Sequence, residues 1–526
     1  MDRTVSESRR SSHSASLVSF GALSLATPLL AMPGAVHAGD WLISPSLEAA
    51  EIFTDNVNLA PDARADSEAI TEITPGISIQ GEGARLRGFA EYRMQNLFYL
   101  SEPDRSTTNH QFLGSGTAEV REDSLFLDAE ARATQVLIDP DTFSGDSISG
   151  VNRTDVYTMK LSPYFVHDFG GTANLLARYT NAMVRYDSTA SNTDLNQVDV
   201  SLTSGRRFTR LGWGLSYYAA DYDQERRTLT SGDAEHRVAS ANVSYAITRR
   251  FALLGQAGDE FHEYEVPTRG FRNGSYTAGG FRWRPTRRSS ISALFGDRYE
   301  SASVDWQPSQ RTSVSVRWRD TDVGVNVGEA WDADASLFTR HTRWGLRYVE
   351  DSGITQQLDF IGQPFGYLGV VDGRLVFEAD PFAGAIQVPV TQDLFPLTNE
   401  AFRRERGEVY FILDRPRSSV FVRVYDEDRF YLTSGDEERT TGMSSFGSWR
   451  FARLTSWIGS VDIARRELRL PAGVEDDLWR VETGLQRQLG PRSVGSLTVS
   501  RAERDSSLGG RDYTENRITL RVMLRL

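Results

Sequence analysis

The chain has 526 residues, a formal net charge of −13 and no cysteine. Because only the N-terminal region carries a long apolar run, the sequence excludes a bundle of transmembrane helices. The lack of cysteine excludes a disulfide framework and a cysteine-based metal site. The net negative charge argues against nucleic acid as a partner, since nucleic-acid binding needs a basic surface.

Residues 1–38 are expected to form a secretory signal peptide. The Arg9-Arg10 pair supplies the basic region, residues 17–32 supply the apolar core, and Val36-His-Ala38 supplies a small-residue cleavage site. Cleavage there leaves a mature chain of residues 39–526. No linker divides this mature chain, so we expect it to fold as one unit.

The mature chain opens with strand-like segments. Residues 41–59 predict a strand followed by a polar turn at 54–56, and residues 68–80 predict the returning strand, which residues 81–84 turn around. Residues 86–95 then alternate between apolar or small side chains and charged or polar ones. Since successive side chains of a strand point to opposite faces, this alternation predicts strands with one apolar and one polar face.

The same hairpin unit then repeats at intervals of about forty residues, which suits two membrane-spanning strands of about 9–11 residues, one tight turn and one longer loop. Eleven turns predict twenty-two flanking strands, and the first and last strands raise the total to twenty-four. Because the turns near Pro308 and Asp351 are weakly marked, the predicted range is about 20–24 strands. A propeller would show four short strands and a signature in each repeat, which the sequence lacks. The predicted turns lie near Gly81, Arg121, His167, Gly205, Thr248, Pro285, Pro308, Asp351, Pro416, Ala452 and Pro491.

The two kinds of connection differ in composition. The short turns combine proline or glycine with arginine, as at residues 248–250, 285–288, 308–311, 415–418 and 490–493. The long loops are expected to be acidic, with Asp139, Asp141 and Asp146, Asp221, Asp223 and Glu225, and residues 426–428, 436–438 and 475–477. Short turns on one rim and long loops on the other are typical of an outer-membrane barrel, with periplasmic and extracellular ends.

The last ten residues predict how the sheet ends. Ile518, Leu520, Val522 and Leu524 fall on one face of a strand, and polar side chains fall on the other. An unpaired edge of this kind is an aggregation hazard, which a barrel removes by pairing its last strand with its first. An edge strand of a soluble β-sandwich is the alternative. The rim asymmetry and the signal peptide favour an all-β, large single-chain antiparallel transmembrane β-barrel in the outer membrane of a Gram-negative bacterium.

A barrel of this size is expected to enclose a lumen that side chains alone do not fill. The polar faces of the strands would line it, and charged rings in a pore select the solute by field and hydrogen bonding. A one-residue slip in register would exchange lumen for lipid. The predicted lumen-lining residues are Arg87, Glu91, Arg93, Arg317, Arg319, Arg423, Arg480, Glu482, Arg521 and Arg525.

Residues 362–402 break the hairpin rhythm with a segment rich in glycine, proline and phenylalanine. Three interpretations stay open for this insertion. It is an outsized surface loop, a loop folded into the lumen as a constriction or plug, or a small intervening hairpin.

The sequence contains no credible catalytic, cofactor or metal site, so we expect the protein not to be an enzyme. The five histidines of the mature chain lack metal-ligand spacing, and no phosphate-binding glycine loop occurs. Residues 145–148 read Gly-Asp-Ser-Ile but lie in a predicted acidic loop without the strand-to-helix turn that a serine nucleophile needs. Acidic residues 426–428 either hold divalent ions that bridge lipopolysaccharide or form a solvated loop.

The start of the mature chain carries a family resemblance. Residues 45–61 read Pro-Ser-Leu-Glu-Ala-Ala-Glu-Ile-Phe-Thr-Asp-Asn-Val-Asn-Leu-Ala-Pro, of which residues 53–61 are the specific part. This segment resembles the opening of the outer-membrane β-barrel proteins associated with PEP-CTERM/exosortase systems. The resemblance implies a role in passing polysaccharide across the outer membrane, and it supplies no binding residues.

Three functions are compatible with these features. The first is a porin-like conduit in exopolysaccharide export that works with periplasmic export proteins. The second is a general diffusion porin for small solutes, and the third is a structural or surface-interaction barrel that anchors polymer. Outer-membrane lipid and lipopolysaccharide are expected partners in each case.

Overall fold

The computed structural model describes residues 40–138, 153–187, 191–225, 232–266, 270–325, 327–353, 365–371, 374–378, 386–389, 400–468 and 473–526. The predicted signal peptide and residues 145–148 lie outside these ranges. Within them, no helix is both long enough and apolar enough to cross a membrane.

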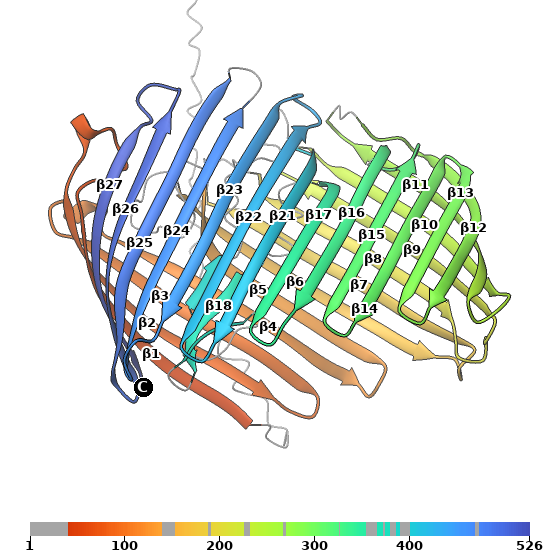
Figure 1. Cartoon of the computed structure of the whole chain (residues 1–526), viewed down its shortest axis with the longest axis horizontal. Coiled ribbons are helices and arrows are strands. Elements are labelled where there is room, and N and C mark those ends of the chain that lie inside the picture. The colour runs from red at the N-terminus through yellow and green to blue at the C-terminus, as the bar shows by residue number, and fades with distance from the viewer. Residues whose placement is uncertain are drawn as a thin grey trace, which may run out of the picture.

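The described residues form a 24-stranded antiparallel sheet that closes on itself (Figure 1). Two short 3-10 helices, Asp62–Arg64 and Pro103–Arg105, lie in its connections. The barrel strands are β1 (Asp40–Thr54), β2 (Glu68–Glu82), β3 (Leu86–Tyr99), β4 (Thr107–Arg121), β5 (Leu125–Leu137), β6 (Arg153–Asp168), β7 (Ala173–Tyr186), β8 (Thr193–Ser204), β9 (Leu211–Gln224), β10 (Ala234–Ala246), β11 (Phe251–Tyr264), β12 (Gly274–Thr286), β13 (Ser289–Asp297), β14 (Tyr299–Ser309), β15 (Thr312–Thr321), β16 (Gly328–Phe338), β17 (Thr342–Gly353), β21 (Phe402–Arg415), β22 (Ser418–Tyr431), β23 (Glu437–Trp449), β24 (Thr455–Leu468), β25 (Val474–Gly490), β26 (Ser493–Ser506) and β27 (Tyr513–Arg525).

Strands β1 and β27 close the sheet, as the alternation of the last strand predicted. They pair antiparallel, with Ser46 opposite Arg525 and Thr54 opposite Arg517. The backbone N–H of Leu526 donates to the carbonyl of Pro45 at 2.9 Å, which extends the pairing to the last residue. The closed sheet therefore leaves no free edge at this seam.

The side chains alternate between an apolar outer face and a polar inner face. Leu520 is 53 % exposed and Phe53, on the partner strand, is 51 % exposed, whereas Glu48 on the opposite face is 4 % exposed. A water-soluble protein would bury such apolar side chains and expose the charges. Since an apolar exterior on a closed barrel is what a bilayer requires, the chain is a transmembrane β-barrel of the outer membrane.

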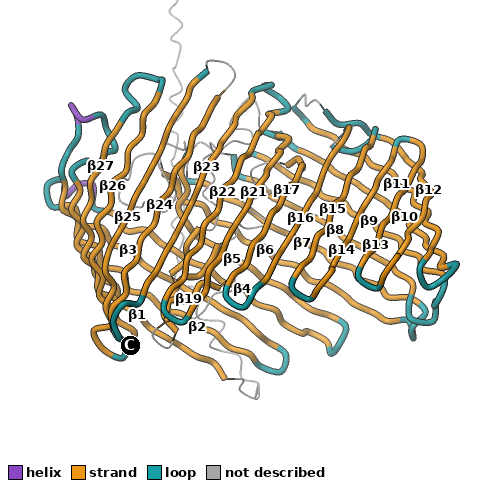
Figure 2. The backbone as a smooth tube through the Cα atoms, in the orientation of Figure 1, coloured by secondary structure: helices purple, strands orange, loops and turns teal. Residues whose placement is uncertain are grey.

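The connections at the two rims differ in length (Figure 2). Residues 287–288, 310–311, 416–417 and 491–492 form tight turns at the rim to which the chain's C-terminal strand runs, whereas residues 55–67 make a long connection at the other. The predicted asymmetry is confirmed. The short-turn rim is the periplasmic end and carries the arginine- and proline-containing turns.

Several acidic groups that were expected in long loops lie instead at the ends of strands. Residues 426–428 belong to β22, and residues 475–477 belong to β25. The strands extend beyond the lipid because cross-strand ion pairs continue the ladder there, as where Arg439 of β23 forms two hydrogen bonds to Asp426, at 3.1 and 2.9 Å. The prediction of solvated loops at these positions was wrong.

One predicted turn was also misplaced. Asp351 lies within β17, and the turn that precedes this strand is formed by residues 339–341. This turn has neither proline nor glycine, so it lacks the usual sequence signal. The Thr339 hydroxyl stabilises it by accepting backbone N–H groups, from His341 at 3.3 Å and from Thr342 at 3.0 Å.

The short interval between the predicted turns near Pro285 and Pro308 contains two strands of the barrel. Strand β13 has nine residues and β14 has eleven, and Arg298 alone connects them. Arg298 adopts a φ of 60°, in the left-handed region that tight connections require. The weakly marked turn near Pro308 is confirmed separately by residues 310–311, which connect β14 to β15, and the strand count stands at twenty-four.

The insertion at residues 362–402 contains a second, small sheet. Strands β18 (Phe365–Val371), β19 (Arg374–Glu378) and β20 (Ile386–Pro389) form it in the order β19-β18-β20. The described pairings join these strands only to one another. These pairings show a small sheet and do not place it relative to the barrel wall, and the remainder of the insertion up to residue 399 lies outside the described residues.

Leu520→Arg is expected to destabilise the folded barrel by about 2–4 kcal/mol, because it places a cation on the lipid face near the middle of the apolar stretch of β27. Urea titration of the protein refolded into lipid vesicles measures this loss. Leu508→Arg is the matched control, since Leu508 is 43 % exposed but lies in the connection outside the strands. Equal losses for the two variants would contradict the assignment of the lipid face.

Candidate functional site

All ten predicted lumen residues lie on the inner face of the barrel. Each alternates along its strand with side chains of the outer face, most of which are apolar. Val424 is 48 % exposed beside Arg423, and Val481 is 40 % exposed between Arg480 and Glu482. The same alternation holds in β3, β15 and β27, which carry Arg87, Glu91, Arg93, Arg317, Arg319, Arg521 and Arg525.

The structure brings some of these residues together through carboxylates that the sequence did not single out. Arg93 and Arg521 both pair with Glu48, at 2.8 and 2.9 Å, although they come from β3 and β27. Arg521 also lies 3.7 Å from Glu72. Arg480 and Glu482, two residues apart on β25, pair at 3.1 Å. The closure of the barrel is what makes Glu48 a shared partner.

The side chains of the inner face are not uniformly exposed to solvent. Arg423 is 2 % exposed, whereas the side chain of Arg317 is 63 % exposed and lies 3.5 Å from the half-exposed Asp332 of β16. Arg423 is therefore covered by other groups, whereas Arg317 is exposed. Alternation along a strand identifies the face on which a side chain lies and not what covers it.

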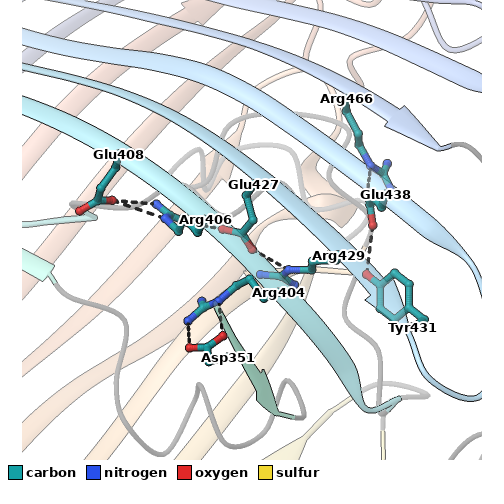
Figure 3. Close-up of polar contacts among 9 residues, drawn as sticks. All are labelled: Asp351, Arg404, Arg406, Glu408, Glu427, Arg429, Tyr431, Glu438 and Arg466. Carbon is teal, nitrogen blue, oxygen red and sulfur yellow. Dashed lines mark hydrogen bonds and ion pairs between the residues drawn. The ribbon is translucent and has the colours of Figure 1, made fainter. Parts of the chain in front are cut away.

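A belt of ion pairs, which is buried on β21 and β22 and partly exposed at Asp351 of β17, crosses the inner face of these three strands (Figure 3). Glu427 is fully buried and accepts hydrogen bonds from Arg406 and, at 2.7 Å, from Arg429. Arg404 donates to both carboxylate oxygens of Asp351, at 2.9 and 2.6 Å. This is the bidentate geometry in which arginine binds a carboxylate most strongly.

The belt continues across β23 to β26. Glu438 accepts from Arg466 and from the hydroxyl of Tyr431, the latter at 3.0 Å. Arg504 of β26 lies 3.0 Å from Asp476 of β25, and both are buried. Arg466 of β24 also lies 3.9 Å from Asp476, so these contacts tie six consecutive barrel strands, β21 to β26, to one another. We call this set of contacts the inner ion-pair belt.

The inner ion-pair belt was missed because its acidic members were expected in loops. The sequence did contain a signal for the belt. In β21 the even-numbered residues, such as Arg404 and Arg406, lie on the face opposite to that of Val409, which is exposed on the outside. Desolvating such charges is costly, and the Glu427 pairs offset this cost through hydrogen bonds from both Arg406 and Arg429. The belt therefore fixes register and rigidity more than it adds stability.

An apolar cluster joins two walls of the barrel near its extracellular end. Ala401 and Leu432, at the start of β21 and after β22, belong to one packed cluster with residues of the inner faces of β6 to β10. The backbone N–H of Leu432 donates to the carbonyl of Ala401 at 2.8 Å, and Glu400 accepts from the N–H of Thr433 at 2.7 Å. We call this the mouth cluster; its opposite members are Val156, Ala182, Val184, Tyr186, Leu195, Ala220, Tyr222 and Ala234.

A pair of histidines lies beside the mouth cluster on β10 and β11. The Nδ1 atoms of His236 and His262 lie 2.8 Å apart, both side chains are buried, and the ring of Tyr222 packs edge-on against His236. Glu260 lies 3.3 Å from the other nitrogen of His262. Over the residues that the structure describes, no group of three or more histidine and acidic side chains is arranged to hold a metal ion.

Comparison with solved structures returns large outer-membrane barrels. The FrpB iron transporter of Neisseria meningitidis is 11 % identical, with a TM-score of 0.48 over 93 % of this chain and 82 % of that chain. The ferric-catecholate import receptor Fiu of E. coli K12 is 10 % identical, with a TM-score of 0.47 over 91 % of this chain and 81 % of that chain. The siderophore receptor PirA of Pseudomonas aeruginosa is 10 % identical, with a TM-score of 0.41 over 93 % of this chain and 81 % of that chain. No protein-family model and no curated protein matches the chain.

Glu427→Gln is expected to destabilise the barrel by about 3–5 kcal/mol, because it leaves Arg406 and Arg429 buried without their shared carboxylate. The control is Glu482→Gln, whose pair with Arg480 is partly exposed and is worth at most about 1 kcal/mol. Urea unfolding in vesicles compares the two variants. If Glu427→Gln cost no more than its control, the inner ion-pair belt would not be a buried network.

Proposed function

We propose that this protein is a gated outer-membrane conduit through which an exopolysaccharide leaves the cell. The observation that carries the proposal is the inner wall, which has arginines, carboxylates and tyrosines in alternation on a 24-stranded barrel. A barrel of this many strands encloses a lumen that is too wide for side chains alone to fill. Periplasmic export proteins would deliver the polymer to the short-turn rim.

The exposed arc of the inner wall supports a polar cargo. Arg317 and Asp332 are both exposed to the interior, and Arg521 is 38 % exposed there. Guanidinium groups donate several hydrogen bonds in a fixed plane, which suits sugar hydroxyls and carboxylates alike. Such an arrangement offers a sliding chain many weak contacts and no deep site.

The mouth cluster supports gating and counts against a permanently open porin. A diffusion porin needs an aqueous path at all times, whereas here residues of opposite walls pack together at the extracellular end. Passage of a polymer therefore requires Leu432 and its partners to separate. The apolar packing sets the free energy that this separation must overcome.

Leu432→Asp is expected to open the mouth, because a carboxylate in an apolar cluster is poorly solvated and favours separation. Single-channel recording in planar bilayers should show rare openings for the natural protein and frequent, larger ones for this variant. Leu432→Met, which preserves an apolar side chain of similar size, should behave like the natural protein. Persistently low conductance in the folded Leu432→Asp protein would mean that the lumen is blocked elsewhere, against the proposed gate.

Removal of the protein from its bacterium is expected to trap polysaccharide in the periplasm, and the natural chain supplied in trans should restore secretion. Polymer assays of the medium and of the periplasmic fraction measure this. Normal secretion combined with slower uptake of small sugars would instead favour the general diffusion porin. Normal secretion with polymer detached from the cell surface would favour an anchoring barrel.

A further inference from the structure

A hollow of about 310 Å³ lies on strands β22 to β25, near the periplasmic rim. It spans two rows of residues that face one another across these strands and point to lipid. The side chains at the centre of the hollow are small, because Ser445, Gly447 and Gly459 lie there between larger side chains. The rows are Val420, Gly447, Gly459 and Thr483, and Val422, Ser445, Val461 and Val481.

Two tryptophans border the hollow on its periplasmic side. Trp449 and Trp457 lie opposite each other in the next row, and they are 55 % and 40 % exposed on the outer face. The indole N–H of Trp457 donates to the hydroxyl of Thr483 at 2.9 Å, which holds its ring over Gly459 as one wall of the hollow. Since exposed tryptophans mark the lipid–water interface, the hollow opens toward the acyl region of the periplasmic leaflet.

The turns below these tryptophans are strongly basic. Residues 414–418, 450–454 and 487–492 contain six arginines and one acidic residue, Asp414. Arg417, Arg453 and Arg487 are exposed, and within the described part of the chain none of the three has an ion-pair partner. Arg487 points outward, since it lies two residues from both Leu485 and Leu489, which are exposed on the outer face of the same strand. Their charge is available to an external anion. The six arginines of the three turns are Arg415, Arg417, Arg450, Arg453, Arg487 and Arg492.

We propose that this surface binds an anionic phospholipid of the periplasmic leaflet, with an acyl chain in the hollow and the phosphate against Arg417, Arg453 and Arg487. The distances fit, because Val420 and Gly447 lie three residues from the turns, about 10 Å at 3.3 Å per residue. Guanidinium groups bind phosphate oxygens through paired hydrogen bonds. A water-soluble polymer could reach the arginines but not a hollow that opens into lipid. This inference does not depend on the transported cargo.

Native mass spectrometry of the detergent-purified protein tests the site with equal amounts of phosphatidylglycerol and phosphatidylcholine of identical acyl chains. The natural protein should retain phosphatidylglycerol preferentially. Replacing two arginines, in Arg453→Gln with Arg487→Gln, should lower that retention about thirtyfold and leave phosphatidylcholine unchanged.

Gly447→Leu tests the hollow separately. A Cβ at Gly447 would lie 3.4 Å from the Trp457 ring, an ordinary contact, so the added side chain enters the hollow without displacing backbone. This variant should lower the retention of both lipids. Heat-dependent migration on gels verifies that each variant is folded.

The matched control is Arg287→Gln with Arg340→Gln, which removes two exposed arginines from turns elsewhere on the same rim. The control should bind phosphatidylglycerol like the natural protein. Equal loss in the control would mean that the whole rim attracts anions, and equal retention of both lipids by the natural protein would mean that no headgroup is selected. If Arg453 and Arg487 governed the binding of dextran sulfate but not of lipid, the surface would serve a soluble polyanion. Each of these three outcomes overturns the proposal.

Discussion

The antiparallel pairing of β1 with β27 is the interaction on which the rest of the structure depends. Lipid offers no hydrogen bonds, so every backbone N–H and C=O group within the membrane needs a partner in the protein, and a sheet meets this requirement only by closing. The pairing from Ser46 to Thr54 supplies that closure. Once the cylinder is closed, the period of two along each strand divides all its side chains into a lipid face and an inner face.

The division into two faces explains how the barrel holds so much buried charge. Arg406, Glu427 and Arg429 would be prohibitive on the lipid face, yet on the inner face they satisfy one another across β21 and β22. A slip of one residue in β21 would move Arg406 toward lipid, and a slip in β22 would move Glu427 and Arg429, so the charges specify the register of both strands. The inner wall is thereby rigid along the ion-pair belt and open to water near Arg317.

The outer face is specialised as well. Tryptophans and arginines gather at the periplasmic rim of β22 to β25, and the small side chains above them thin the wall at one place. The extracellular ends of the same strands carry outward ion pairs such as Arg439 with Asp426. The two rims are therefore chemically different, which gives the barrel a preferred orientation toward the leaflets and places the mouth cluster on the cell's exterior side.

The sequence by itself predicted a closed barrel of about 20–24 strands, ten of the eleven tight turns and an inner position for the ten proposed lumen residues, because alternation and turn chemistry are local properties. Only the tertiary structure decided what each inner residue meets. It gave Arg93 and Arg521 a common carboxylate in Glu48, buried Arg423, and brought Leu432 against β6 to β10. These contacts join residues far apart in the chain, and they depend on the curvature and stagger of the closed sheet, which no local pattern encodes.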